Sequence, residues 1–259
     1  MTAVSAGAGV HSYLAKQVKT LRKTRKPALR GEEDAVHKMR VATRRLRSLL
    51  TTYSHLYAKV PLSRKRLRWL AAELGEVRDL EVLRMRFAER LGGDEPEWFQ
   101  ALLGEERRAY RRLARAFARK RFAKLMEAAD RMARHPHFSK EAVRPAAKEL
   151  IDDVEAARDD LASALFAIAS APDPDAARHA ARKAAKRTRY TAEAASALGA
   201  VAESIAAEAE RLQTVFGRYQ DDLVAIAYLE AHAPDSPVLE VEKRARDEDL
   251  AAIAAEQWT

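Results

Sequence analysis

Two sequence motifs occur twice in this chain of 259 residues, and both recur at the same offset of 142 positions. The segment from His37 to Arg47 matches the segment from His179 to Arg189. At the same offset, Leu74–Asp79 matches Phe216–Asp221. Two motifs that keep their separation in both copies indicate an internal duplication. We therefore expect two related, pseudo-symmetric folding units.

The composition favours helix along nearly the whole chain. Ala, Leu, Arg, Glu and Lys dominate, most Gly and Pro residues fall at a few short breaks, and no segment has the pattern of a strand. Short connections between long helices favour antiparallel bundles. The sequence thus predicts an all-α domain over residues 1–259, built from one four-helix unit at 1–135 and a second at 136–259. The predicted helices span residues 10–26, 34–58, 62–90, 96–134, 140–170, 174–197, 200–231 and 238–256, with a kink expected in the fourth at Gly104 or after Phe117.

The two predicted units carry opposite charge. Residues 1–135 contain 32 Lys and Arg against 15 Asp and Glu, a net charge of +17, whereas residues 136–259 contain 15 against 23, a net charge of −8. Six of the 15 basic residues of the second unit nevertheless lie between Arg178 and Arg189, with no acidic residue among them. A basic cluster within an acidic unit indicates a binding role, and the overall charge of +9 favours a polyanionic partner.

The repeated basic residues form a stripe on each helix. At 100° per residue, the four members of each stripe lie within a sector about 80° wide, opposite a face of apolar or small residues. Like charges at this spacing repel one another, so keeping them twice is explained if an external anion compensates them. The first basic stripe is His37, Arg40, Arg44 and Arg47, with Arg45 beside it, and faces away from Met39, Ala42, Leu46, Leu49 and Tyr53. The second basic stripe is His179, Arg182, Lys186 and Arg189, with Arg187 beside it, and faces away from Ala181, Ala184, Thr188 and Ala195.

These motifs resemble the CHAD domain, the conserved histidine α-helical domain, over essentially the whole chain. The resemblance implies two pseudo-symmetric four-helix bundles with a basic surface or cleft that binds inorganic polyphosphate, and association with polyphosphate granules. The polyphosphate-binding positions that it implies are His37, Arg40, Arg44, Arg45, Arg47, His179, Arg182, Lys183, Lys186, Arg187, Arg189 and Tyr190. The motifs that carry it are His37-Lys-Met-Arg40-Val-Ala-Thr-Arg44-Arg45-Leu-Arg47 with the preceding Val36, Leu74-Gly75-Glu-Val-Arg78-Asp79-Leu80, and His179-Ala-Ala-Arg182-Lys183-Ala-Ala-Lys186-Arg187-Thr-Arg189-Tyr190.

Two aspartates and two glycines repeat as faithfully as the histidines. A carboxylate within an anion site is repulsive, so we expect Asp79 and Asp221 to pair with a stripe arginine of the adjacent helix rather than to bind a metal. Gly75 and Gly217 are expected to permit close helix packing. The second copy departs from the family pattern at Gln220-Asp221-Asp222, and we assign no binding role to that stretch.

Other charged segments have no counterpart in the repeat. The basic residues between Arg107 and Lys124, and those between Arg64 and Arg68, either widen the anion path or form solvated helix faces. Some CHAD proteins carry a fused triphosphate-tunnel domain with a Glu-x-Glu-x-Lys signature. Glu240-Val-Glu242-Lys243 approaches it, but the lysine is one position early and no strand-rich region accompanies it, so we interpret this match as coincidence.

Several classes of protein are disfavoured by what the sequence lacks. With no cysteine, it has no disulfide, thiolate metal site or cysteine nucleophile. No run of about 18 apolar residues predicts a membrane span, and the first ten residues lack the pattern of a signal peptide. We expect a cytoplasmic protein.

Three functions remain open, with polyphosphate binding first. A nucleic-acid-binding helical protein is the second, but Tyr190 is the only aromatic residue adjacent to a motif and available for base stacking. A phosphoryl-transfer enzyme that uses a histidine is the third, but the sequence shows no partnered carboxylate and no phosphate-binding glycine loop. We therefore expect no catalytic residue, no cofactor and no protein-held metal, and Mg²⁺ only as an ion carried by the polymer.

Overall fold

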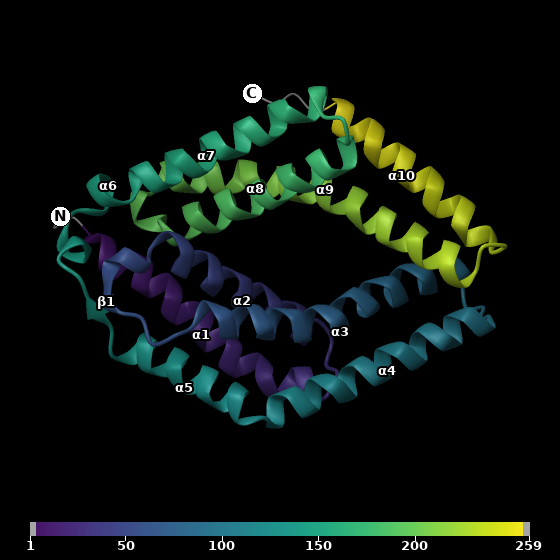
Figure 1. Ribbon diagram of the computed structural model, residues 1–259, viewed down its shortest axis with the longest axis horizontal. Coiled ribbons are helices and arrows are strands. Elements are labelled where there is room, and N and C mark those ends of the chain that lie inside the picture. Colours follow the sequence, from purple (N-terminus) through teal and green to yellow (C-terminus); the bar gives the residue numbers. More distant parts are fainter. Residues whose placement is uncertain (1–3, 256–259) are drawn as a thin grey trace.

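The computed structural model describes residues 4–255 and is built almost entirely of helices. Figure 1 shows α1–α5 in the lower part of the view and α6–α10 in the upper part, with α2 and α3 on the side that faces α8 and α9. The helices are α1 (Ala6–Leu29), α2 (Ala35–Thr52), α3 (Arg64–Leu91), α4 (Glu97–Ala118), α5 (Lys120–Arg134), α6 (Ala146–Glu149), α7 (Ile151–Phe166), α8 (Pro174–Ala194), α9 (Ala200–His232) and α10 (Pro237–Ala255), joined in places by the 3₁₀ turns η1 (Ser54–Leu56), η2 (Glu141–Val143), η3 (Ala167–Ser170) and η4 (Ser196–Leu198).

The all-α prediction is confirmed, but three predicted helices differ in extent. The fourth is divided into α4 and α5, because Arg119 between them is extended, with a ψ of 145°. This break agrees with the kink expected after Phe117, whereas Gly104 lies within α4. The fifth begins with η2 and α6, because Pro145 holds the preceding Arg144 in an extended conformation. The second ends at Thr52 rather than at residue 58. Residue 256, the last of the eighth predicted helix, lies outside the described residues.

One short ribbon was not predicted. The strands β1 (Tyr57–Lys59) and β2 (His137–Phe138) pair antiparallel, with Tyr57 opposite Phe138. Two and three residues are too few for the alternation that identifies a strand in sequence. The ribbon joins the α2–α3 connection to the segment that follows α5, which is where the predicted boundary between the two units lies.

The helices bury one face each, as their periodicity predicts. The side chains opposite the first basic stripe are fully buried, including Met39, Leu46 and Tyr53. Those opposite the second stripe are also buried, but they are small, as at Ala181 and Ala184. Along the described chain, no helix is both long and apolar enough to cross a membrane.

Contacts at two ends join the N-terminal helices to the C-terminal helices. At one end, Glu193 of α8 accepts a hydrogen bond from Tyr13 Oη of α1 at 2.5 Å and one from Arg45 of α2 at 2.7 Å. At the other end, Arg86 of α3 forms ion pairs with Asp222 of α9 and with Glu242 of α10. The facing parts of α2, α3, α8 and α9 lie between these two contacts, and they form the candidate site.

Candidate functional site

The two basic stripes meet at a single cleft. At the offset of 142, residues 35–52 of α2 correspond to residues 177–194 of α8. Matching positions of these two helices line the same cleft. The cleft has a volume of about 380 Å³. Its polar lining is His37, Arg40, Arg44, Arg78, Asp79, His179, Arg182, Lys186, Tyr190, Gln213, Gln220 and Asp221, and its apolar lining is Val41, Val82, Leu83 and Val224.

A second hollow of about 290 Å³ extends the cleft. The two cavities share Arg44, Lys186 and Tyr190, so they adjoin at the central position of the two stripes. The second hollow adds three cations, Arg47, Lys183 and Arg187. Ten residues separate His37 from Arg47, which corresponds to about 15 Å along the helix axis at 1.5 Å per residue. The predicted residues therefore line an elongated basic path rather than a closed pocket.

Two predicted binding residues do not line this path, which corrects their placement. Arg45 lies 2.7 Å from Glu193, and its guanidinium is 5.8 Å from the centre of the Tyr190 ring. Arg189 lies 2.8 Å from Glu193 and 2.9 Å from Glu210. Both arginines stabilise the contact between helices, because carboxylates already neutralise them. The angular position of a residue on its helix gave no sign of these partners on other helices.

The repeated aspartates pair with stripe arginines, as predicted. Arg40 Nη2 lies 3.3 Å from Asp79 Oδ1, and Arg182 Nη2 lies 3.9 Å from Asp221 Oδ1. Each pair joins a stripe helix to the helix that follows it, and it fixes the arginine within the cleft.

The role predicted for the glycines is corrected. A methyl group at Gly75 would lie 3.9 Å from Arg40 Nε, and one at Gly217 would lie 3.9 Å from Arg182 Nε. These are ordinary van der Waals distances to a side chain. A methyl group would therefore fit at both positions, and the glycines are not required for close contact of helix backbones.

Crowding of cations changes the protonation equilibria of the cleft. Burial lowers the pKa of both Arg40 and Arg182, and the paired carboxylates offset this only in part. Lys186 is 9% exposed. Its burial, together with the charges of Arg182, Arg44 and Arg40, lowers its pKa to about 6. Without a ligand, Lys186 is therefore largely neutral at pH 7.

The two histidines lie at the same end of the cleft but in different surroundings. Burial, and then the charge of Arg78, lowers the pKa of His37, so that it is neutral at pH 7. His179 Nδ1 lies 2.8 Å from Gln220 Oε1. Gln220 corresponds to Arg78 at the offset of 142. The neighbouring helix thus places a cation, Arg78, near His37 and a neutral amide, Gln220, beside His179.

Several lining residues were missing from the sequence prediction. Arg78 belongs to the Leu74–Leu80 motif, but the sequence prediction gives it no binding role, although it precedes the paired Asp79. Neither Gln213 nor Gln220 is predicted as a lining residue, although Gln220 corresponds to Arg78 at the offset of 142. The buried Nε of Arg182 and the buried Oε1 of Gln213 have no hydrogen-bond partner within residues 4–255.

The other charged segments lie outside the cleft. The run from Arg107 to Lys124 covers α4 and the start of α5, where Arg121 lies over the Trp69 ring at 4.5 Å. The run from Arg64 to Arg68 begins α3, and neither run contributes to either cavity. Glu242 is fully buried against Arg86 and Arg90, so this glutamate forms structural ion pairs.

No cluster of three or more His, Asp and Glu side chains in residues 4–255 is arranged to hold a metal ion.

Comparison with known proteins identifies the family of this chain. The sequence model of the CHAD domain matches residues 12–230. Two uncharacterized Mycobacterium tuberculosis proteins, MT2285 and Rv2226, are 32% identical over 238 residues, which is 85% of this chain, and the chain spans 44% of their length.

Two solved structures share the fold. PptA from Streptomyces chartreusis has a TM-score of 0.73 at 18% identity, over 96% of this chain and 98% of that one. The CHAD domain from the plant Ricinus communis has a TM-score of 0.66 at 22% identity, over 97% and 88%. These identities show a common fold alone. The match of the family model over most of the sequence shows that this chain belongs to the CHAD domain family.

Proposed function

We propose that this protein binds inorganic polyphosphate along the path formed by the cleft and its extension. The observation that carries the proposal is that both basic stripes contribute cations to the same cleft, which a second basic hollow adjoins. Eight cations line the path: Arg40, Arg44, Arg47, Arg78, Arg182, Lys183, Lys186 and Arg187. Four of them also have an acidic partner: Arg40 with Asp79, Arg78 with Glu81, Arg182 with Asp221 and Arg187 with Asp160. A linear polyanion with one charge per phosphate matches a row of cations better than a compact anion does.

The donors suit phosphate oxygens. Arginine offers planar, paired N–H groups that match two oxygens, and lysine offers a single charge that adapts to a flexible chain. A bound polyanion would also raise the pKa of Lys186 and restore its charge. The unfavourable crowding of cations in the empty cleft is thus compensated by the ligand.

The lining favours polyphosphate over nucleic acid. Recognition of single strands relies on aromatic platforms for the bases, and Tyr190 is the sole aromatic residue among those that line the cleft or its extension. Polyphosphate has no base and needs only charge and acceptor geometry. The proposed role is binding without catalysis, with Mg²⁺ entering only as a counterion of the polymer and with the protein located on polyphosphate granules.

A competition experiment tests the proposal. Long-chain polyphosphate, single-stranded DNA, RNA and orthophosphate would each compete with a labelled polyphosphate at one fixed salt concentration. We expect polyphosphate to compete best and orthophosphate to compete poorly, because a single phosphate meets one or two cations instead of eight. The slope of log K against log salt should be about −5 to −6, taking the single-strand coefficient for eight contacts. Stronger competition by DNA or RNA, or a nearly flat salt dependence, would contradict the proposal.

A further inference from the structure

A dense basic surface lies outside the cleft, at the start of α3, along α4 and at the start of α5. Nine cations and no acidic residue occur between Arg107 and Lys124, and residues 64–68 add four cations. None of them lines the cleft or its extension, and all except Arg66 are exposed. Figure 1 shows α4 and α5 along the lower edge of the molecule. Together these cations form the arginine face: Arg64, Lys65, Arg66, Arg68, Arg107, Arg108, Arg111, Arg112, Arg115, Arg119, Lys120, Arg121 and Lys124.

Two contacts hold the three segments of the arginine face together. The Arg121 guanidinium lies 4.5 Å from the centre of the Trp69 ring, which joins the start of α5 to the start of α3. Arg112 Nε lies 3.0 Å from Glu76 Oε2, which joins α4 to α3. At 100° per residue, Trp69 and Glu76 lie on the side of α3 roughly opposite Arg78, which lines the cleft. The arginine face therefore points away from the cleft.

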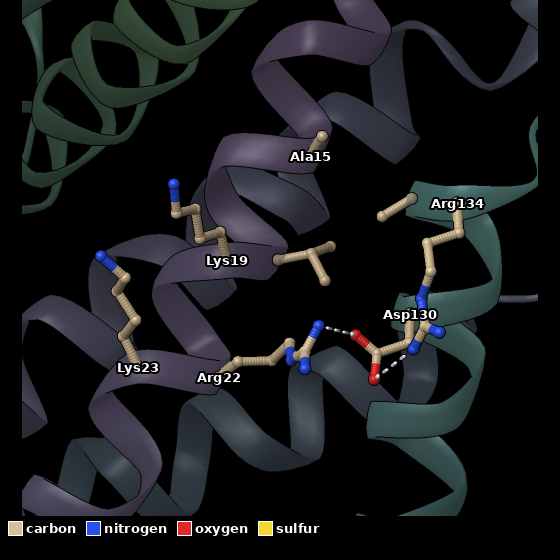
Figure 2. Close-up of a pocket in the computed structure, with 8 residues that line it drawn as sticks. Ala15, Lys19, Arg22, Lys23, Asp130 and Arg134 are labelled. Atoms are coloured by element: carbon tan, nitrogen blue, oxygen red, sulfur yellow. Dashed lines mark ion pairs between the residues drawn. The ribbon is translucent and has the colours of Figure 1, made fainter.

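Most of the charge on the arginine face has no internal partner. Within residues 4–255, Arg112 is its only member that forms an ion pair with a carboxylate. The basic hollow between α1 and α5 differs, because one carboxylate serves two arginines there: Asp130 lies 3.7 Å from Arg22 and 3.4 Å from Arg134 (Figure 2). Unpaired like charges repel one another on the arginine face, and an external polyanion would compensate them.

The layout of the arginine face fits a duplex better than a single flexible chain. In the cleft, the cations form one elongated path that a flexible polymer can follow. On the arginine face, they spread over three helical segments as an open, two-dimensional array. Double-stranded nucleic acid presents two rows of phosphates on a stiff rod, so it can contact such an array without the ordering cost of a flexible chain. Ten of the cations are arginines, whose planar guanidinium binds two phosphate oxygens.

The arginine face lacks the apolar groups that binding to a lipid surface would use. Helices that lie on membranes insert apolar side chains beside their cations. The apolar side chains of α4 and α5, such as Phe117 and Phe122, are buried in the core. Along these two helices, which the structure describes in full, no large apolar side chain is exposed. The surface therefore favours nucleic acid over an anionic membrane.

We propose that the arginine face binds the phosphate backbone of double-stranded nucleic acid without reading its sequence. Arg111 and Arg115, about one turn apart on α4, would contact one row of phosphates, and cations of α3 and α5 would contact the other. Because the arginine face and the cleft lie on opposite sides of α3, the protein can hold a duplex and a polyphosphate chain at the same time. The duplex site does not depend on what the cleft binds.

The test compares two ligands and two double variants of the whole chain. The probes are a short labelled DNA duplex of mixed sequence and a labelled polyphosphate, each measured by fluorescence anisotropy. Arg111→Glu with Arg115→Glu should weaken duplex binding at least about tenfold and make its salt slope shallower by about 1.8, the value for two duplex contacts. Arg44→Glu with Arg47→Glu makes the same change of charge in the cleft and should leave duplex binding nearly unchanged. A duplex of different sequence should bind equally.

Three results would overturn the proposal. The first is the absence of duplex binding by the wild type at low salt. The second is an equal loss of duplex binding from both double variants, because only total charge would then matter. The third is that Arg111→Glu with Arg115→Glu weakens binding of polyphosphate or of anionic vesicles as much as binding of the duplex. Duplex binding that persists in a wild type unable to bind polyphosphate would support the duplex site and contradict only the proposed function of the cleft.

Discussion

The first basic stripe, on α2, ends in cations that keep their charge free, whereas the second stripe, on α8, ends in an arginine that two glutamates neutralise. Neither Arg44 nor Arg47 has an acidic partner within residues 4–255, and both line the path. Arg189, the counterpart of Arg47, lies within 3 Å of both Glu193 and Glu210. Matching sequences thus place matching positions in different electrostatic environments.

The central positions of the stripes differ as well. Arg44 contributes a planar guanidinium, which is permanently charged. Its counterpart Lys186 is buried among arginines, and its pKa is lowered to about 6. The comparison indicates a division of roles: the first stripe provides permanent charge, and part of the charge of the second stripe depends on the ligand.

Charge reversal in the first stripe should have the largest effect. We expect Arg44→Glu with Arg47→Glu to weaken polyphosphate binding by about 100-fold or more, because two contacts are lost and two repulsive charges enter the path. Arg111→Glu with Arg115→Glu is the matched control, with the same change of charge on exposed residues of α4 outside the path. Equal losses from the two double variants, measured at one salt concentration, would mean that only total charge matters.

The second stripe should make binding depend on pH. Bound phosphate raises the pKa of Lys186 above its value of about 6 in the empty cleft. Binding therefore takes up a proton in the pH range between these two pKa values. Affinity should be greatest below pH 6 and should fall by up to about tenfold per pH unit as the pH rises through that range.

Calorimetry in buffers of different ionisation enthalpy measures this proton uptake. Lys186→Arg should reduce it, because arginine remains charged in the empty cleft. Lys183→Arg, at an exposed position of the same helix, should leave it unchanged. Equal proton uptake by the wild type and Lys186→Arg would show that Lys186 does not titrate on binding.

Substitutions at the ends of the two stripes should have the smallest effects on polyphosphate binding. Arg47→Ala should weaken binding several-fold and make the salt slope shallower by about 0.7, the value for one single-strand contact. Arg189→Ala should leave the slope unchanged, because Arg189 lines neither the cleft nor its extension. Salt titrations of both variants check the difference, and a shallower slope for Arg189→Ala would place that residue on the polymer.

The helices and most of the cleft could be predicted from sequence for a specific reason. A duplicated motif on a helix fixes which side chains share a face, so the sequence predicts the members of each stripe. The sequence leaves open whether the two stripes face each other, and the structure places His37, Arg40, Arg44, His179, Arg182 and Lys186 in one lining. The pairing of Asp79 with Arg40 also followed, because a carboxylate among cations needs a partner.

The remaining features depend on contacts between distant segments. Glu193 removes Arg45 and Arg189 from the path, and nothing local to either arginine indicates this. Arg78 and Gln213 enter the cleft through the packing of α3 and α9 against the stripe helices. The low pKa of Lys186 depends on three arginines from two helices and on burial, which the pattern of charges along one helix does not contain.

The stoichiometry of a short polymer tests most directly the claim that both stripes bind one chain. Calorimetry would use a polyphosphate of defined length, just long enough to span the cleft and its extension. We expect one chain per protein, and Arg182→Ala with Lys183→Ala should weaken that site without changing the stoichiometry. Two chains bound independently by the wild type, one of them lost in this double variant, would show that the stripes act as separate sites and would contradict the account.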